Sequence, residues 1–182
     1  MITASQKKKE NIAEYLLYMW QIEDLIRANG LDLDRIKTNI IDKYTSLSPE
    51  QQKQMLEWYE SLIDMMRREG VTEKGHLQLN KNVVADLEDL THRLLKEPKF
   101  SAFNNLYYST LPYIVELRAK AGDNPPGEIE ACFNALYGLL MLRLQGKEIT
   151  PQTQAAAAGI SKFLATLAMY YRQDYNNEIE WS

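Results

Sequence analysis

Apolar residues recur at intervals of three and four along almost the whole chain, which is the period of an amphipathic helix. The segment after Pro49 shows this most plainly. Its apolar positions fall on one side of a helical projection and its acidic positions on the other: Met55, Trp58, Tyr59, Leu62 and Met66 against Glu57, Glu60 and Asp64. No segment shows the sustained period of two that is typical of strands. The pattern predicts an all-α protein.

Capping residues, glycines and prolines divide this pattern into about seven helices. Gly30 suits the end of the first helix, and Ser48, Pro49 and Gln51 form a start signal for the third. Pro112 lies inside the fifth segment and should kink it or divide it in two. We expect helices at about 5–29, from "LDLD" at 31–34 through 44, and at 48–70, 80–96, 99–121, 128–145 and 150–175.

The length of 182 residues suits one domain with one hydrophobic core. The clearest loop, "GDNPPG" at 122–127, would be a boundary if there were two domains. The helices after it would make a thin domain by themselves. We therefore expect a single-domain helical bundle over residues 1–175, followed by a loose tail at 176–182.

Charge and composition exclude several classes of partner. The 21 basic and 25 acidic residues give a net charge of −4, which argues against nucleic acid as a partner. The longest apolar runs, "YLLYMW" and "ALYGLLML", are far shorter than the roughly 20 residues that span a bilayer. The single cysteine, Cys132, excludes an internal disulfide and fits a reducing compartment. We expect a cytoplasmic protein that binds neither nucleic acid nor membrane.

Sequence motifs for metal, cofactor or nucleophilic chemistry are missing. His76 and His92 lie sixteen residues apart, and neither belongs to a metal-binding spacing. There is no glycine-rich phosphate loop and no nucleophile elbow. The sequence therefore predicts no metal and no cofactor, and it favours a protein without catalytic activity.

Three charged residues interrupt apolar helical faces and are the candidates for a polar site. Glu23 shares the helical face of Ile12, Met19 and Ile26. Arg118 lies on the apolar side of a later helix, with Tyr107, Leu111 and Ile114. Arg143 lies between Leu136 and Leu139 on the apolar side of the next helix. An unpaired buried charge costs several kcal/mol, so Glu23 should meet an arginine. We expect Arg118 or Arg143, with Arg27 as the local rival at i,i+4.

This polar group has three interpretations. The first is a structural ion pair. The second is an inter-helical pocket for a small anionic or zwitterionic ligand around Glu23, Arg118 and Arg143. The third is a catalytic carboxylate with a shifted pKa.

Tyrosines and small residues mark a candidate interface. The chain has 11 tyrosines, which concentrate in "LYYSTLPY" at 106–113 and "MYYRQDY" at 169–175. Tyr108 and Tyr170 point away from the apolar stripes, and amphipathic aromatic residues are common at protein interfaces. The stretch "QAAAAG" adds a low-bulk surface at Ala155, Ala158 and Gly159, where another helix could approach closely. These features predict a homo-oligomer or a complex with another protein.

Four longer stretches carry a family resemblance. They are "KKKENIAEYLLYMWQIEDLIRA" near the start, "IVELRAKAG" at 114–122, "EIEACFNALYGLLMLRL" at 128–144 and "ISKFLATLAMYY" at 160–171. Together they resemble a family of small all-helical proteins from Bacteroidales-type bacteria that is catalogued only as a domain of unknown function. The resemblance implies an all-α, single-domain, cytoplasmic bacterial protein and brings no catalytic residues.

The sequence thus leads to two hypotheses of function. The first is a non-enzymatic binding or regulatory protein that self-associates through an aromatic-rich helical surface. The alternative is a small-molecule binder or enzyme built around Glu23, Arg118 and Arg143.

Overall fold

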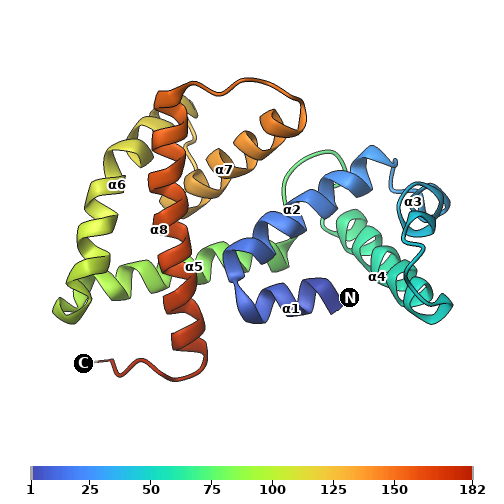
Figure 1. Ribbon diagram of the computed structural model, residues 1–182, viewed down its shortest axis with the longest axis horizontal. Helices are drawn as coiled ribbons and strands as arrows, with labels where there is room; N and C mark the ends of the chain where they lie inside the picture. Colours follow the sequence, from blue (N-terminus) through green and yellow to red (C-terminus); the bar gives the residue numbers. More distant parts are fainter. Residues whose placement is uncertain (1, 182) are drawn as a thin grey trace. The chain divides into compact units, whose positions relative to one another are not determined.

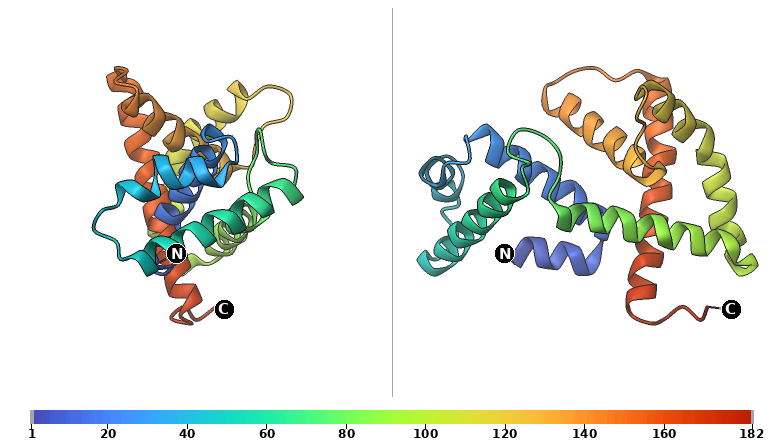
Figure 2. Two further views of the ribbon diagram at one scale, coloured as in Figure 1. Left: turned by 90° about the vertical axis from the view of Figure 1, so that its right-hand side faces the viewer. Right: turned by 180° about the vertical axis from the view of Figure 1, so that it is seen from behind.

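The computed structural model describes residues 2–181, which form helices and connecting loops without a β-strand (Figures 1 and 2). The prediction of an all-α protein is confirmed. The α-helices are α1 (Ile2–Glu10), α2 (Ile12–Ala28), α3 (Leu33–Asn39), α4 (Pro49–Arg68), α5 (Gln78–Lys96), α6 (Ser101–Lys120), α7 (Glu128–Leu144) and α8 (Pro151–Tyr175). Two short 3-10 helices, η1 (Ile41–Lys43) and η2 (Pro98–Phe100), join neighbouring helices.

Two features of the helix pattern differ from expectation. The segment predicted as one helix at 5–29 forms two helices, because the helical conformation is interrupted at Asn11. The side chain of Asn11 accepts a hydrogen bond from the backbone N–H of Ala13 at 3.0 Å, which is how a capping residue starts a new helix. Conversely, Pro112 does not divide α6, which is one helix. The missing proline N–H costs one backbone bond, to the carbonyl of Tyr108, and the helix continues on both sides.

The predicted start signals are present. The Ser48 hydroxyl accepts from the N–H of Gln51 at 3.2 Å, and the Gln51 side chain accepts from the N–H of Ser48 at 2.9 Å. The capping box at the start of α4 is therefore complete. At α8 the hydroxyl of Thr150 accepts from the N–H of Thr153 at 3.3 Å, with Pro151 at the first helical position.

Contacts group the described residues into two compact units. Unit 1 holds residues 2–9 and 14–82, and unit 2 holds residues 10–13 and 83–181. The expectation of one domain over residues 1–175 stays a prediction, and the last residue of the expected tail, Ser182, lies outside the described residues.

Unit 1 has its core between α2, α3 and α4. The helices α3 and α4 pack against each other. Side chains from all three helices are almost fully buried: Leu16, Met19, Trp20 and Ile26 from α2, Ile36 from α3, and Met55, Tyr59, Leu62, Ile63 and Met66 from α4. The stripe predicted after Pro49 thus supplies the core-facing side of α4.

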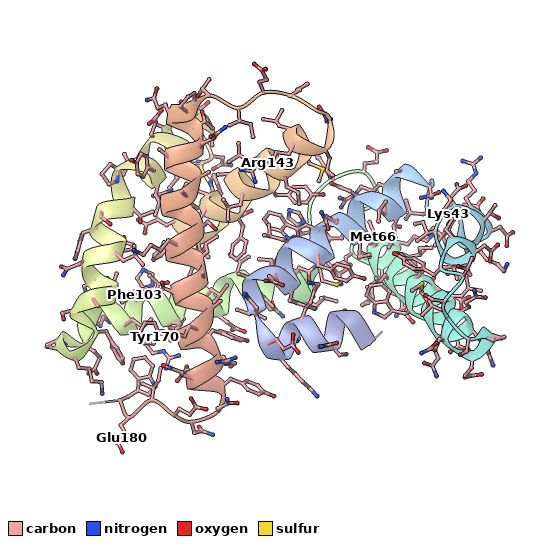
Figure 3. The ribbon with its side chains drawn as sticks, viewed as in Figure 1. Lys43, Met66, Phe103, Arg143, Tyr170 and Glu180 are labelled. Carbon is pink, nitrogen blue, oxygen red and sulfur yellow. The ribbon has the colours of Figure 1, made fainter. Side chains whose placement is uncertain are left out.

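Unit 2 has its core between α6, α7 and α8, which pack pairwise. Phe103 of α6 and Tyr170 of α8 meet edge to face at 5.7 Å (Figure 3). The buried residues of α7 all come from its first two turns: Ile129, Ala131, Cys132 and Phe133. Its later apolar residues are only half-buried, and Leu144 is 70% exposed. This end of α7 borders the groove described below.

Candidate functional site

Glu23 is fully buried in unit 1 and is bound by three donors from one short segment. Its Oε2 lies 2.6 Å from Nδ1 of His76. Its Oε1 accepts from the backbone N–H of Leu77 at 2.9 Å and from the amide of Asn80 at 2.7 Å. None of these three donors in unit 1 is an arginine. A histidine and two neutral donors, 53 to 57 positions away, stabilise this carboxylate instead.

These bonds fasten the beginning of α5 to α2. Leu77 directly precedes the first residue of α5, so its N–H is one of those that a helix leaves without an internal partner. A second carboxylate, of Glu69, accepts from the next N–H, of Gln78, at 2.6 Å. Negative charge at a helix N-terminus is also favoured by the helix dipole. Glu23 therefore acts as a capping group supplied from another helix.

Trp20 completes the surroundings of the Glu23 carboxylate. It lies one turn before Glu23 on α2, and its ring stacks on His76 with centroids 4.1 Å apart and planes inclined by 11°. The side chain of Glu23 is 1% exposed and that of His76 is 25% exposed. A carboxylate beside a histidine could act as an acid–base pair, but this carboxylate is saturated by internal donors. The arrangement supports the structural interpretation.

Arg27 also has a structural role in unit 1. Its guanidinium pairs with Asp24 at 2.8 Å and donates to the carbonyl of Val71 at 3.1 Å, and to the carbonyl of Gly75. Gly75 has a φ of +85°, which suits glycine at this tight turn. Arg27 therefore secures the 71–75 turn, which leads into His76, and it has no bond to Glu23.

Arg118 and Arg143 lie in unit 2. Nε of Arg118 donates to the carbonyl of Pro126 at 2.8 Å, which ties the end of α6 to the loop before α7. Arg143 lies in the last turn of α7 and is exposed (Figure 3). The snorkelling of a long side chain near a helix end accounts for its place on an apolar face.

An acidic group that the sequence analysis did not single out surrounds the start of α7. The hydroxyl of Tyr107 donates to Glu128 at 2.6 Å. The Glu88 carboxylate lies against Gly127, where a Cβ would stand 1.9 Å from its oxygen. Burial, followed by the nearby charge of Glu130, raises the pKa of Glu88. Local periodicity does not reveal this group, because its members come from three helices.

A groove opens between α6, α7 and α8. Its volume is about 430 Å³, and small residues form much of its wall. Its lining is mainly apolar: Tyr113, Leu117, Ala135, Gly138, Leu139, Leu142, Ala156, Ala157 and Ile160. The charged residues of its lining, Glu116 and Lys120, pair with each other at 2.6 Å. The groove offers an apolar surface without an unpaired charge in its lining.

The exposed side of α6 borders this groove. Tyr108 is 61% exposed, Tyr113 is 38% exposed and Val115 is 57% exposed. The whole stretch 101–115 contains no charged residue. Tyr113 is exposed on α6 and also lines the groove, and it lies about 140–160° around the helix from Tyr108 and Val115.

The other residues expected at an interface lie in different surroundings. Tyr170 packs against Phe100 and Phe103 at 5.2 and 5.7 Å and is half-buried. Ala155 and Ala158 are exposed on α8. A Cβ at Gly159 would lie 3.7 Å from the ring of Tyr113, so this glycine lies close to α6. The small residues thus serve a helix contact inside unit 2 as well as an open surface.

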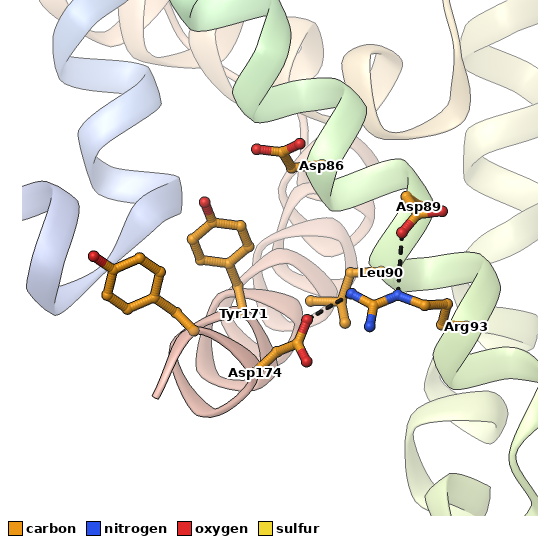
Figure 4. A pocket seen from close by; sticks show the side chains of 7 residues that line it. Asp86, Asp89, Leu90, Arg93, Tyr171 and Asp174 are labelled. Carbon is orange, nitrogen blue, oxygen red and sulfur yellow. Dashed lines mark hydrogen bonds and ion pairs between the residues drawn. The ribbon is translucent and has the colours of Figure 1, made fainter. Parts of the chain in front are cut away.

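A second, smaller pocket of about 210 Å³ lies between α5 and α8 (Figure 4). Its lining is largely polar: Asp86, Asp89, Leu90, Arg93, Tyr171, Asp174 and Tyr175. Nε of Arg93 lies 3.1 Å from Asp89, and its terminal nitrogen lies 2.5 Å from Asp174. Trp181, from the segment after α8, covers this ion pair. Its indole donates to Asp174 at 2.8 Å, and the guanidinium of Arg93 lies 4.4 Å from its ring centroid.

Two classes of site are not found within residues 2–181. No group of three or more histidine, cysteine, aspartate or glutamate side chains is placed to hold a metal ion. In the same residues, no helix combines the length and apolar character that crossing a membrane needs.

The protein is thus all-α, with a buried carboxylate bound by three donors in unit 1 and two surface pockets in unit 2. A family model described as "Domain of unknown function (DUF4924)" matches residues 1–178, and the chain belongs to that family. The resemblance to a domain of unknown function is thereby confirmed. No curated protein and no solved structure matches the chain.

Proposed function

We propose that this protein is a non-enzymatic binding protein that associates with a second copy of itself through the exposed side of α6 and the adjoining groove. The observation that carries this proposal is the absence of charge along residues 101–115, together with the exposure of Tyr108 and Val115. Interface cores are depleted in charged residues and enriched in tyrosine. The exposed, uncharged and partly apolar surface of α6 at residues 101–115 has the composition of an interface core.

Charge favours a second copy as the occupant. Each chain carries a net charge of −4, so two copies repel each other over most of their surfaces. The strip at 101–115 adds nothing to that repulsion. A two-fold interface also uses the same patch on both subunits, which an uncharged patch permits. A helix of 20 residues is about 30 Å long, so two α6 helices could meet over several turns.

The groove supplies the complementary shape. Ala135, Gly138 and Ala157 leave room for side chains from a partner helix. A Cβ at Gly138 would meet no atom within 4 Å. The groove begins at Tyr113, which is also exposed on α6. Side chains of one copy's α6 could therefore enter the groove of the other while the reverse contact forms.

The first test is light scattering after size-exclusion chromatography, with Val115→Asp. We expect a concentration-dependent dimer for the unaltered protein and a monomer for the variant. Ala85→Asp is the matched control, because it adds the same charge at an exposed position of α5 in the same unit. A strictly monomeric unaltered protein, or equal effects of the two variants, would overturn the proposal.

Gly138→Glu separates loss of association from loss of fold. Replacing a helical glycine removes an entropic cost of up to about 1 kcal/mol, so the variant should unfold no more easily than the unaltered protein. Its side chain would place a charge in the groove, and we expect it to be monomeric. Gly138→Ala has the same backbone effect without the charge and should remain dimeric.

A further inference from the structure

We infer that the pocket between α5 and α8 is a binding site for a small organic cation that carries an ammonium group. The pocket lies within unit 2, and Asp86, Leu90 and Arg93 follow one side of α5 at intervals of about one turn (Figure 4). On α8, Asp174 and Tyr175 both lie about one turn after Tyr171. Its volume of 210 Å³ is about that of seven molecules of liquid water, which is enough for an ammonium group with short substituents.

An anion is a poor fit because Arg93, the pocket's one cationic side chain, is already occupied. Its guanidinium pairs with Asp89 on its own helix and with Asp174 on α8, and it lies over the ring of Trp181. An incoming anion would have to displace carboxylates that are held in place on two helices.

The negative charge exceeds what Arg93 neutralises. Three aspartates face one arginine, which leaves a net charge of −2 in the lining. Asp89 and Asp174 both pair with Arg93, whereas among the described residues Asp86 belongs to no ion pair. Burial is the main cause that raises the pKa of Tyr171, and the charge of Asp86 is the next. Asp86 is therefore the carboxylate available to a ligand.

The aromatic side chains make the site suitable for an organic cation. Tyr171 is half-buried at the pocket, and Tyr175 is 78% exposed beside it. The face of an aromatic ring attracts ammonium groups, with a contribution of about 0.5–1 kcal/mol at exposed sites. A carboxylate beside two rings offers charge and apolar contact together. A bare metal ion has no apolar groups to pack against the rings, and no group of ligands for a metal is found in residues 2–181.

The test is a titration with tetramethylammonium chloride, followed by the NMR signals of the tyrosine rings, at constant ionic strength. We expect saturable binding in the millimolar range or tighter, with the shifts centred on Tyr171 and Tyr175. Asp86→Asn should weaken binding at least threefold, and Asp123→Asn, which removes a charge from an exposed loop, should not. Tyr175→Phe should bind as well as the unaltered protein, while Tyr175→Leu should bind more weakly.

Three results would overturn the inference. They are an absence of saturation, an equal effect of the two aspartate substitutions, and preferential binding of sulfate over tetramethylammonium. Because Tyr175→Phe keeps the ring and loses only the hydroxyl, it distinguishes contact with the ring from a hydrogen bond. The outcome does not depend on self-association, because the pocket and the α6 strip have no residue in common.

Discussion

The carboxylate of Glu23 and the imidazole of His76 meet at 2.6 Å although 53 positions separate them in the chain. Leu77 and Asn80 add two further donors to the same carboxylate. One buried acidic residue thereby joins α2 to the turn before α5 and to the first turn of that helix.

We predict that Glu23→Ala lowers the free energy of unfolding by about 2–4 kcal/mol, because it leaves the N–H of Leu77 and the amide of Asn80 buried without an acceptor. Glu23→Gln should cost less, since its amide oxygen can still accept from both. Urea titration followed by circular dichroism measures these differences. Glu60→Ala, an exposed change on α4, should stay within about 0.5 kcal/mol.

A double-mutant cycle isolates the contribution of His76. His76→Phe keeps a ring that can stack on Trp20 but loses the bond to Glu23. We expect the effects of Glu23→Ala and His76→Phe to be non-additive by about 1 kcal/mol. Additive effects would mean that the short distance contributes no coupling energy.

Asp174 should make unit 2 more stable at neutral pH than in acid. Partial burial by itself raises the pKa of Asp174, but hydrogen bonds from Arg93 and Trp181 outweigh it and hold that pKa below its ordinary value of 3.8. A carboxylate with a lowered folded-state pKa stabilises the fold above the unfolded-state value, and this contribution is lost as pH falls through the folded-state pKa. Because the group is partly exposed, the contribution is no more than about 1 kcal/mol.

The comparison is between the unaltered protein and Asp174→Asn, by thermal unfolding from pH 7 to pH 3. The variant should be less stable at pH 7, and the two curves should converge below pH 3.8. The control Asp123→Asn should differ little in stability from the unaltered protein at every pH in this range. A difference that stays constant over this range would contradict the role assigned to Arg93 and Trp181.

Glu88 should have the opposite pH dependence. Burial, then the charge of Glu130, raises the pKa of Glu88 above its ordinary value of 4.5. An acidic group with a raised folded-state pKa binds its proton more tightly in the fold, so its ionised form costs stability above pH 4.5. Glu88→Gln should therefore increase stability at pH 7, by less than about 1 kcal/mol because the group is partly solvated.

The gain from Glu88→Gln should disappear well below pH 4.5, where both side chains are uncharged. Glu148→Gln, in the exposed loop before α8, is the matched control and should change stability little at either pH. A variant that is less stable than the unaltered protein at pH 7 would show that Glu88 makes a net favourable interaction there.

The local features of the fold were predictable because they depend on neighbouring residues. The apolar stripe after Pro49 predicts the buried side of α4, and Ser48 with Gln51 predicts its start. The break at Asn11 was missed because the apolar period continues through it. Of the two outcomes expected at Pro112, division of the helix does not occur, because a helix can lose one hydrogen bond where its other contacts are sufficient.

The sequence by itself determined the all-α class, most helix starts and the place of Glu23 on an apolar helical face, because helical period and capping operate over three to four residues. The partner of Glu23 was decided only by the tertiary structure. The turn at 71–75, which Arg27 stabilises, places His76 and the start of α5 beside that carboxylate. No periodicity links positions 53 residues apart, and any arginine on an apolar face satisfied the charge argument equally well. The groove and the pocket with Arg93 depend in the same way on how separate helices pack.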